Sequence, residues 1–425
     1  MTKHFPLIAG LALLAVAIVA GLLVPMGSSA PATIPLPVTR MLACAVGDPT
    51  VGQTTVSVTD QSSFSAGELG ALPNPPDVTA SFDNPAKTII VRGSSSVAGV
   101  SQYNESGTAM AIPCAPPVTT GAWNAVMTTA GATLVLTNVD ATPAVVDVFL
   151  YGQTGPITSP GLRDIPVASG ATQMLPIDAS LAQSDTPIGV QVRASKGRIA
   201  AVLRILSPGG FDWQLPQTSA DTDVVIAGIP ADAGIRTLSL TNTDPSTKAE
   251  VQLQILGQAG AFQVPGLETI EVLASRVTTV DITQALGGQA SAIHLISDHP
   301  VTASISSSAP DPMGASGQAP LAGTIVLPPV GGVIWAANPT DTASWIQIKY
   351  VDASGAPATL DTPIPAQSIA SADLPTSGTQ VVVSTDSAEV RASLVLSDGG
   401  TSILPLVSGG SATSVPVPSL APGLG

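Results

Sequence analysis

Charged residues are scarce in this chain of 425 residues: Asp, Glu, Lys and Arg together make up 10%, and aromatic residues make up only 3%. Acidic residues outnumber basic residues by 29 to 14, so the formal net charge is −15. A negatively charged surface repels phosphate backbones, which argues against nucleic acid as a partner. The hydrophobic fraction of 44% argues against a disordered chain, and with so few aromatics its core must consist of aliphatic side chains.

Residue types that carry chemistry are also few. The chain has three histidines, His4, His294 and His299. His294 and His299 are five positions apart, so in a regular strand they point to opposite faces, which argues against a shared metal with Asp298. The sequence has no G-x-S-x-G, no S-x-x-K and no glycine-rich phosphate loop with a lysine. We therefore expect no catalytic residue, no bound metal and no cofactor.

Asp221 and Asp223 are a pair of carboxylates of the kind that glycosidases use. Acidic pairs at turns are common in an acidic protein and usually only solvate a loop. We therefore interpret this pair as part of a turn.

The N-terminal segment from Leu7 to Val24 carries no charged side chain. As a helix, its 18 residues would span about 27 Å, close to the thickness of a bilayer core. Lys3 precedes it and the next charged residue is Arg40, a distribution that predicts a cytoplasmic N-terminus and an exported remainder. Small residues leave cleavage near Ala32 open, so the protein is expected to be either a single-pass membrane protein or a secreted one.

The only two cysteines, Cys44 and Cys114, lie beyond this segment and hence in an oxidising compartment. We predict a disulfide between them that ties the first module to the start of the second. The two positions are 70 residues apart. For a loop of that length the chain-entropy model gives about 4 kcal/mol of stabilisation.

Internal repeats organise the rest of the chain. The stretches Thr133–Asn138, Thr237–Asn242 and Val333–Asn338 resemble one another, and their final asparagines recur 104 and 96 residues apart. One module is therefore about a hundred residues long. Each asparagine ends an alternating stretch and precedes a turn-like one, so we expect its side chain to bond nearby backbone.

Each module also ends in a similar way, with apolar residues alternating on both sides of a short polar stretch. This pattern predicts an antiparallel hairpin in each module. The segments are Thr88–Val100, Val190–Ile205, Ile293–Ile305 and Val381–Leu396.

Short alternating segments with turn signals between them predict an all-β protein of tandem immunoglobulin-like or fibronectin-like β-sandwich domains after one N-terminal transmembrane helix. The predicted organisation is a cytoplasmic N-terminus (1–6), a transmembrane signal-anchor or signal peptide (7–24), a linker (25–43), a shortened β-domain (44–118), three sandwich repeats (119–218, 219–324 and 325–407) and a flexible tail (408–425).

The hydrophobic segment, the repeat openings and the sequences Asp298–Val301 and Asp386–Val390 resemble an uncharacterised actinobacterial family of membrane-anchored secreted proteins. The resemblance implies an extracytoplasmic location, the tandem β architecture and a cell-envelope role. It implies no catalytic residue.

Strand alternation also places some aromatic side chains among polar ones. In the fourth module Trp345 shares a face with Gln347 and Lys349, opposite the apolar residues of the same strand. In the second module Phe149 and Tyr151 are expected to face outward in the same way. These three aromatics form a candidate interaction surface, unless a loop or a neighbouring domain covers them.

The sequence therefore favours a non-catalytic, extracytoplasmic structural or interaction protein of the cell envelope, in which a string of sandwiches holds a binding surface away from the membrane. The expected partner is an envelope protein or glycan. The alternative is an array of carbohydrate-binding modules that recognises envelope glycan.

Overall fold

The computed structural model describes residues 33–35, 40–45, 51–58, 65–70, 79–83, 85–93, 97–105, 108–125, 131–177, 187–207, 210–231, 234–307, 313–321, 323–352, 354–374, 381–397, 400–406 and 414–416. The segment 7–24, predicted to span a membrane, lies outside these residues. Among the residues described, no helix is both long and apolar enough to cross a membrane. The described chain is nearly all β-strand, with a short helix α3 (Thr283–Leu286) and a 3-10 turn η2 (Pro160–Leu162).

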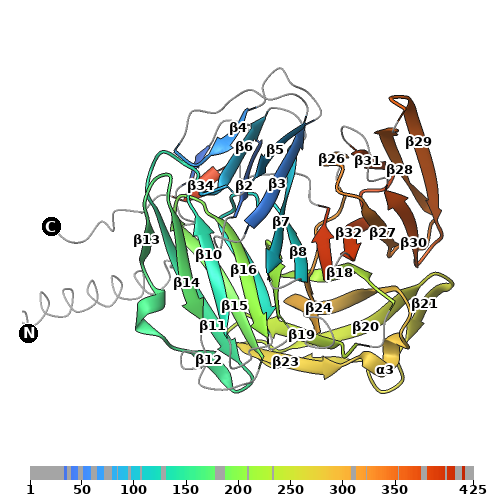
Figure 1. The fold of residues 1–425 in the computed structure, drawn as a ribbon. Coiled ribbons are helices and arrows are strands. Elements are labelled where there is room, and N and C mark those ends of the chain that lie inside the picture. The colour runs from blue at the N-terminus through green and yellow to red at the C-terminus, as the bar shows by residue number, and fades with distance from the viewer. Residues whose placement is uncertain are drawn as a thin grey trace, which may run out of the picture.

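Four two-sheet sandwiches, here called modules 1 to 4, follow one another along the chain (Figure 1). In module 1 one sheet has the order β2 (Arg40–Cys44), β6 (Ile89–Gly93), β4 (Ser65–Glu68). The other has the order β5 (Thr79–Asp83), β3 (Val51–Val58), β7 (Val97–Glu105), β8 (Thr108–Pro113).

Module 2 repeats this arrangement with added edge strands. Its first sheet has the order β12 (Gly155–Ile157), β11 (Ala144–Gly152), β15 (Ile188–Lys196), β9 (Thr120–Ala125), and β13 (Ile165–Val167) also pairs with β11. Its second sheet has the order β14 (Thr172–Ile177), β10 (Ala132–Thr137), β16 (Ala200–Ser207), β17 (Gly210–Gln214).

Modules 3 and 4 keep the same strand order. In module 3 the first sheet has the order β21 (Gly260–Gln263), β20 (Ala249–Gly257), β24 (Ser291–Ser307), β18 (Asp221–Ile229), and β22 (Ile270–Val272) also pairs with β20. The second sheet has the order β23 (Arg276–Asp281), β19 (Thr237–Asn242), β24, β25 (Met313–Ser316). The long strand β24 belongs to both sheets. In module 4 the first sheet has the order β26 (Thr324–Leu327), β31 (Val381–Thr385), β28 (Ser344–Val351), β29 (Pro357–Ile364). The second sheet has the order β30 (Ser368–Leu374), β27 (Gly332–Asn338), β32 (Arg391–Ser397), β33 (Thr401–Pro405).

If the seven common strands are lettered a to g in chain order, every module has one sheet a–e–c and one sheet d–b–f–g. Each connection except f to g therefore crosses from one sheet to the other. An immunoglobulin domain instead joins strands A, B, E and D in one sheet. The predicted sandwich architecture is present, but the predicted immunoglobulin-like connectivity is not.

The four predicted terminal hairpins are wrong for the same reason, because each of these segments is the e-to-f crossing. Module 3 shows this best: the first part of β24 pairs with β18 and β20, and its second part pairs with β19 and β25. A strand that passes from one sheet to the other has a core face on both sides of the crossing. Its apolar alternation is therefore the same as that of a hairpin.

In each of modules 2 to 4 a buried asparagine lies at the end of the b strand and bonds to backbone groups on two other segments. Asn242 is 0% exposed; its amide nitrogen donates to the carbonyl oxygens of Thr247 at 2.7 Å and Val272 at 3.2 Å, and its side-chain oxygen accepts from the Asp244 N–H at 2.9 Å. Asn138 and Asn338 make the equivalent bonds. The predicted bond to nearby backbone is confirmed, and a second bond reaches a segment about 30 residues further along the chain.

The modules pack head to tail, with the outer face of each a–e–c sheet against the outer face of the next d–b–f–g sheet. Between modules 1 and 2, apolar residues of β2 and β6 form a cluster with residues of β10, β16 and β17. Between modules 3 and 4, residues of β18, β20 and β24 pack on β27 and β30. Module 2 contacts module 3 through β9 and β24, and module 4 contacts module 1 through β26, β3 and β7.

These four interfaces close the modules into a ring (Figure 1). Repeated head-to-tail contacts form a ring when the rotation between neighbours closes on itself. At the centre the g strands β8, β17, β25 and β33 each contact the next one. Hydrogen bonds join them: the Gly314 N–H donates to Asp212 at 2.6 Å, the Ala111 N–H donates to Ser402 at 2.8 Å, and the Ser402 hydroxyl donates to the Met110 sulfur at 3.5 Å.

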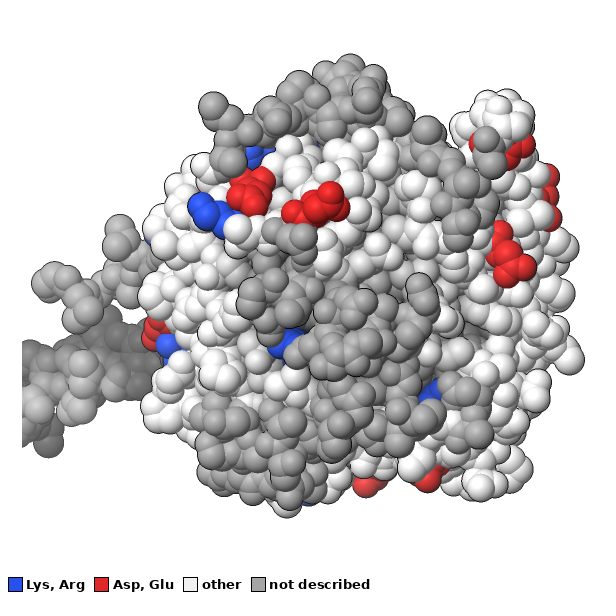
Figure 2. All heavy atoms as spheres, viewed as in Figure 1, with Lys and Arg blue, Asp and Glu red and all other residues white. Residues whose placement is uncertain are grey.

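Ring closure explains the composition of the sequence. In each module the outer faces of both sheets contribute to interfaces, so charged side chains are kept off surfaces that they would normally cover. Figure 2 shows few charged side chains among the described residues of the face that it presents. The expected string of sandwiches therefore forms one closed body.

The two ends of the described chain meet. Strand β1 (Thr33–Pro35) pairs antiparallel with β34 (Ser414–Pro416). β1 lies in the segment expected to be a linker and β34 in the expected flexible tail, so both expectations are wrong at these positions. β2 also begins inside the expected linker, at Arg40.

The predicted Cys44–Cys114 disulfide is present, and it lies within module 1. Both cysteines belong to the core cluster between the two sheets of that module, and neither ties module 1 to module 2. Gly99 packs against the bond, because a Cβ atom at this position would lie 2.4 Å from the Cys114 sulfur.

Candidate functional site

The outer face of the β28–β29 hairpin in module 4 carries Trp345, the most exposed of the aromatics that the sequence singled out. Along β28, Ile346 and Ile348 are 0% exposed and belong to the module core, whereas Trp345 is 37% exposed. The alternation predicted for this strand is confirmed.

Pairing with β29 extends this face. Trp345 lies opposite Pro363, Gln347 opposite Asp361 and Lys349 opposite Thr359, and residues directly opposite share a face. The Gln347 amide donates to Asp361 at 2.8 Å. We call these six residues the β28–β29 face. It combines an apolar ring and a proline with amide, carboxylate and ammonium groups.

Asp386 fixes the start of β28 beside this face. Its carboxylate accepts from the Ser344 hydroxyl at 2.6 Å and from the Trp345 N–H at 3.2 Å. The hydrogen bond from Ser344 is the main reason that the pKa of Asp386 is lowered. The backbone at Trp345 is therefore held in place by hydrogen bonds to Asp386.

Phe149 and Tyr151 lie on β11 in module 2, across the ring from β28 (Figure 1). The structure therefore does not bring them together with Trp345. Arg163 stacks on the Phe149 ring at 3.7 Å. Tyr151 is only 7% exposed and its hydroxyl donates to Gln191 at 3.3 Å, and burial raises its pKa. The expectation that Tyr151 belongs to an exposed surface is wrong.

The two strand histidines lie apart. His299 contacts Asp298 at 3.1 Å on the surface, whereas His294 is buried and its Nε2 lies 3.2 Å from Asp223. Within the part of the chain that the structure describes, no group of three His, Cys, Asp or Glu side chains could hold a metal ion. Sequence reasoning missed the His294–Asp223 contact, because it depends on the β18–β24 register.

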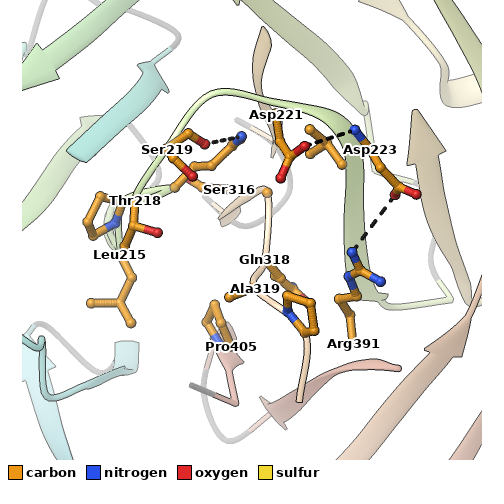
Figure 3. Close-up of a pocket in the computed structure, with 15 residues that line it drawn as sticks. Leu215, Thr218, Ser219, Asp221, Asp223, Ser316, Gln318, Ala319, Arg391 and Pro405 are labelled. Carbon is orange, nitrogen blue, oxygen red and sulfur yellow. Dashed lines mark hydrogen bonds and ion pairs between the residues drawn. The ribbon is translucent and has the colours of Figure 1, made fainter. Parts of the chain in front are cut away.

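A pocket of about 170 Å³ lies where the chain leaves β17, β25 and β33 (Figure 3). We call it the hub pocket. Its walls come from the segment 215–219, the start of β18, the segment 316–320, Arg391 and Pro405. Gln217, in one wall, joins modules 2 and 3: its amide donates to Val301 at 3.1 Å and accepts from the Ala303 N–H at 3.0 Å.

The carboxylates Asp221 and Asp223 both line this pocket. Asp221 accepts from the backbone N–H groups of Thr222 and Asp223. Both carboxylates lie at the start of strand β18, where they pair with β24, so the expectation that the pair belongs to a turn is wrong. Asp223 contacts His294, and the hydrogen bond from His294 is the largest cause of its lowered pKa. Arg391 lies 3.9 Å from the same carboxylate.

Three solved structures illustrate what the chain is similar to. A tetra-tandem repeat from the extending region of a large adhesion protein is 11% identical, with 86% of this chain and 97% of that chain covered and a TM-score of 0.12. The BSP domain of a biofilm associated protein is 8% identical, with 92% and 100% covered and a TM-score of 0.13. Salmonella alpha-2-macroglobulin is 11% identical, with 88% and 29% covered and a TM-score of 0.09. Scores of this size do not indicate a shared overall fold.

No curated protein matches the chain. A family of unknown function, DUF5719, matches residues 94–329, which include all of modules 2 and 3 and more than half of the sequence. The chain belongs to this family of unknown function, DUF5719.

Proposed function

We propose that this protein is a non-catalytic structural or interaction protein of the cell envelope. The closed ring is the observation that carries the proposal. The four sandwiches use their outer sheet faces to bind one another, and the two ends pair, so the ring is suited to act as one stiff body. Among the described residues, the c strands and their neighbouring edge strands lie at the rim of the ring, outside the interfaces between modules (Figure 1).

The proposed location is outside the cytoplasm, with the segment from Leu7 to Val24 as a membrane anchor or as a signal peptide cleaved near Ala32. The Cys44–Cys114 disulfide supports this location, because disulfides persist in oxidising compartments. Protease added to intact cells should degrade the ring, and N-terminal sequencing would distinguish the anchored from the cleaved form. Complete protection in intact cells, with degradation after lysis, would contradict the proposal.

The proposed contact surface is the β28–β29 face, and the partner is an envelope protein or glycan. The test is capture of envelope material by the soluble ring, residues 33–416. Trp345→Ala should weaken capture by roughly 2 kcal/mol, the size of an interface hot spot. Phe262→Ala is the matched control, because Phe262 is another exposed aromatic, 47% exposed, on the edge strand β21 of module 3. Equal loss in both variants would mean non-specific adhesion.

Glycan recognition is the alternative within this proposal, and the composition of the β28–β29 face favours it. Sugar rings have apolar C–H faces that stack on indole, and their hydroxyls can bond to Gln347, Asp361 and Lys349. Titration with soluble envelope polysaccharide should then shift the tryptophan fluorescence of the wild type and not that of Trp345→Ala. Capture of protein from envelope material stripped of glycan would instead select the protein partner.

A further inference from the structure

A groove of about 530 Å³ lies where modules 3 and 4 adjoin, and we call it the module 3–4 groove. It is bounded by the tip of the β20–β21 hairpin, by the end of α3 and by Trp335 on β27 (Figure 1). Small-molecule sites usually have volumes of about 300–1,000 Å³ and are common at interfaces between domains. The groove therefore has the size and the place of a ligand site.

The corresponding junction between modules 2 and 3 is closed. There the Gln153 amide, at the hairpin tip of module 2, donates to the Thr279 hydroxyl on the d strand of module 3 at 3.4 Å. Ser239, on the neighbouring b strand, is only 1% exposed. The repeat places Gln258 at the position of Gln153 and Trp335 at the position of Ser239. With an indole in place of a small side chain, this junction is open.

The buried part of the groove lining is apolar. Ile255 and Leu286 are 1% and 6% exposed, and both belong to the core cluster of module 3. The rings of Trp335 and Phe262 also line the groove. Aromatic rings attract another ring beyond the effect of burial alone. In a chain with only 3% aromatic residues, two rings at one groove favour a ligand with a flat aromatic body.

The polar groups of the groove are uncharged and can be reached from solvent. The side chains of Gln258 and Gln289 are exposed, and the indole nitrogen of Trp335 is not sealed off from solvent. In the part of the chain that the structure describes, these three side chains have no hydrogen-bond partner. None of the described lining residues is charged. A charged ligand would lose hydration without gaining a counter-ion, so the lining favours an uncharged one.

Two other uncharged ligand classes fit this lining less well. A sugar ring has hydroxyls around its whole edge, and those that lie against Ile255 and Leu286 would have no partner. A hydrocarbon chain has no group that could bond to the amides or to the indole N–H. In a groove that is open to solvent, much of the surface of such a chain would also stay in water.

We propose that the module 3–4 groove binds an uncharged aromatic small molecule, with Trp335 and Phe262 against its ring body and Gln258 and Gln289 bonded to its polar group. The site is separate from the β28–β29 face and does not depend on the function proposed for that face. Its ligand is a soluble small molecule, so Phe262→Ala keeps its place as the control in the capture of envelope protein or glycan.

The test uses the complete ring with naphthalene-2-carboxamide and naphthalene-2-carboxylate, two probes of the same shape that differ in charge. Maltose and 1-octanol represent the two other ligand classes. Binding is measured by saturation-transfer NMR and calorimetry. The carboxamide should bind more tightly than every other probe, and the carboxylate should bind at least about tenfold more weakly, because its charge would have no partner.

Two variants locate the site. Gln289→Ala removes a hydrogen bond to the ligand at an exposed position, so it should leave the melting temperature unchanged and weaken carboxamide binding by about threefold to tenfold. Gly257→Leu fills the groove. A Cβ at Gly257 would lie 3.6 Å from the Gly260 carbonyl oxygen and 3.9 Å from the Phe262 ring, which are ordinary contacts, so the variant should fold and should not bind the carboxamide.

Gln284→Ala is the matched control, because Gln284 is an exposed glutamine on α3 that does not line the groove. Its affinity for the carboxamide should equal that of the wild type. The proposal is overturned if the carboxamide does not bind, if the carboxylate binds equally well, or if maltose or 1-octanol binds more tightly. It is also overturned if Gln289→Ala and Gly257→Leu both bind the carboxamide as the wild type does.

Discussion

One substitution at Asn242 tests how much the buried asparagine contributes to the stability of its module. In Asn242→Ala the side chain loses three hydrogen bonds, to Thr247, Val272 and Asp244, at a position that is 0% exposed. At about 1 kcal/mol per bond the free energy of unfolding of module 3 should fall by about 3 kcal/mol. A loss of that size corresponds to roughly a hundredfold change in the opening equilibrium.

The measurement should resolve one module from the other three, because a four-module chain need not unfold in two states. Native-state hydrogen exchange on peptides from β19 and β20 meets this need. Exchange in these strands should accelerate roughly a hundredfold in Asn242→Ala. The strands of module 1, which do not adjoin module 3 in the ring, should keep their protection.

Two further variants sharpen the test. Gln252→Ala, on the exposed face of β20, should leave exchange unchanged. Asn242→Asp keeps the oxygen that accepts from Asp244 but places a carboxylate against two carbonyl oxygens, so it should destabilise the module at least as much as alanine does. If Asn242→Ala costs less than about 1 kcal/mol, the asparagine is a turn residue only, and the inference that its bond to Val272 stabilises the module is refuted.

The remaining predictions concern a disulfide, a carboxylate and an interface. Reduction of Cys44–Cys114 should destabilise module 1 by about 4 kcal/mol, seen as a lower urea midpoint with reductant; an unchanged midpoint would contradict this. The pKa of Asp223 is lowered below its ordinary value of 3.8, mainly by the hydrogen bond from His294, so its stabilising effect is present above about pH 4 and is lost as the pH falls through the lowered pKa. The difference in melting temperature between wild type and Asp223→Asn should therefore disappear in acid, and a difference that persists would refute the assignment. Gly189→Ala places a Cβ 2.5 Å from the Thr241 hydroxyl oxygen across the interface of modules 2 and 3, so it should lower the stability of that interface by about 1–3 kcal/mol. Hydrogen exchange in β9 and β19 should then be faster, and unchanged exchange would mean that this contact can relax.

The all-β class could be predicted from the sequence because it depends on a local pattern, the module length because the repeats recur at a regular spacing, and the disulfide pairing because the chain has only two cysteines. Val146 and Val148 alternate with residues of the other face in the sequence and belong to the module core in the structure. Asn138 and its counterparts occur at the ends of strands, and a turn follows each of them. Strand faces and turns are properties of neighbouring residues, so one sequence is enough to find them.

The ring and its hub could not be predicted, because they depend on contacts between residues that are far apart in the chain. Ala111 and Ser402 are hydrogen bonded across 291 positions. The sheet-to-sheet crossing in β24 has the same apolar alternation as a hairpin, so local pattern could not distinguish them. Gln318 is an unremarkable polar residue in sequence, and only the packing of modules 3 and 4 leaves its oxygen buried and unpaired.

The pairing of β1 with β34 has a mechanical consequence. Thr33 lies opposite Pro416 and Pro35 opposite Ser414, so the chain segments before β1 and after β34 leave from the same end of the ladder. A tensile load applied between those two segments would peel the ladder one pair at a time instead of shearing all pairs together. Two of the three pairs contain a proline, which has no N–H to donate, so little force is needed. Under tension this ladder would part first, before any sandwich extends.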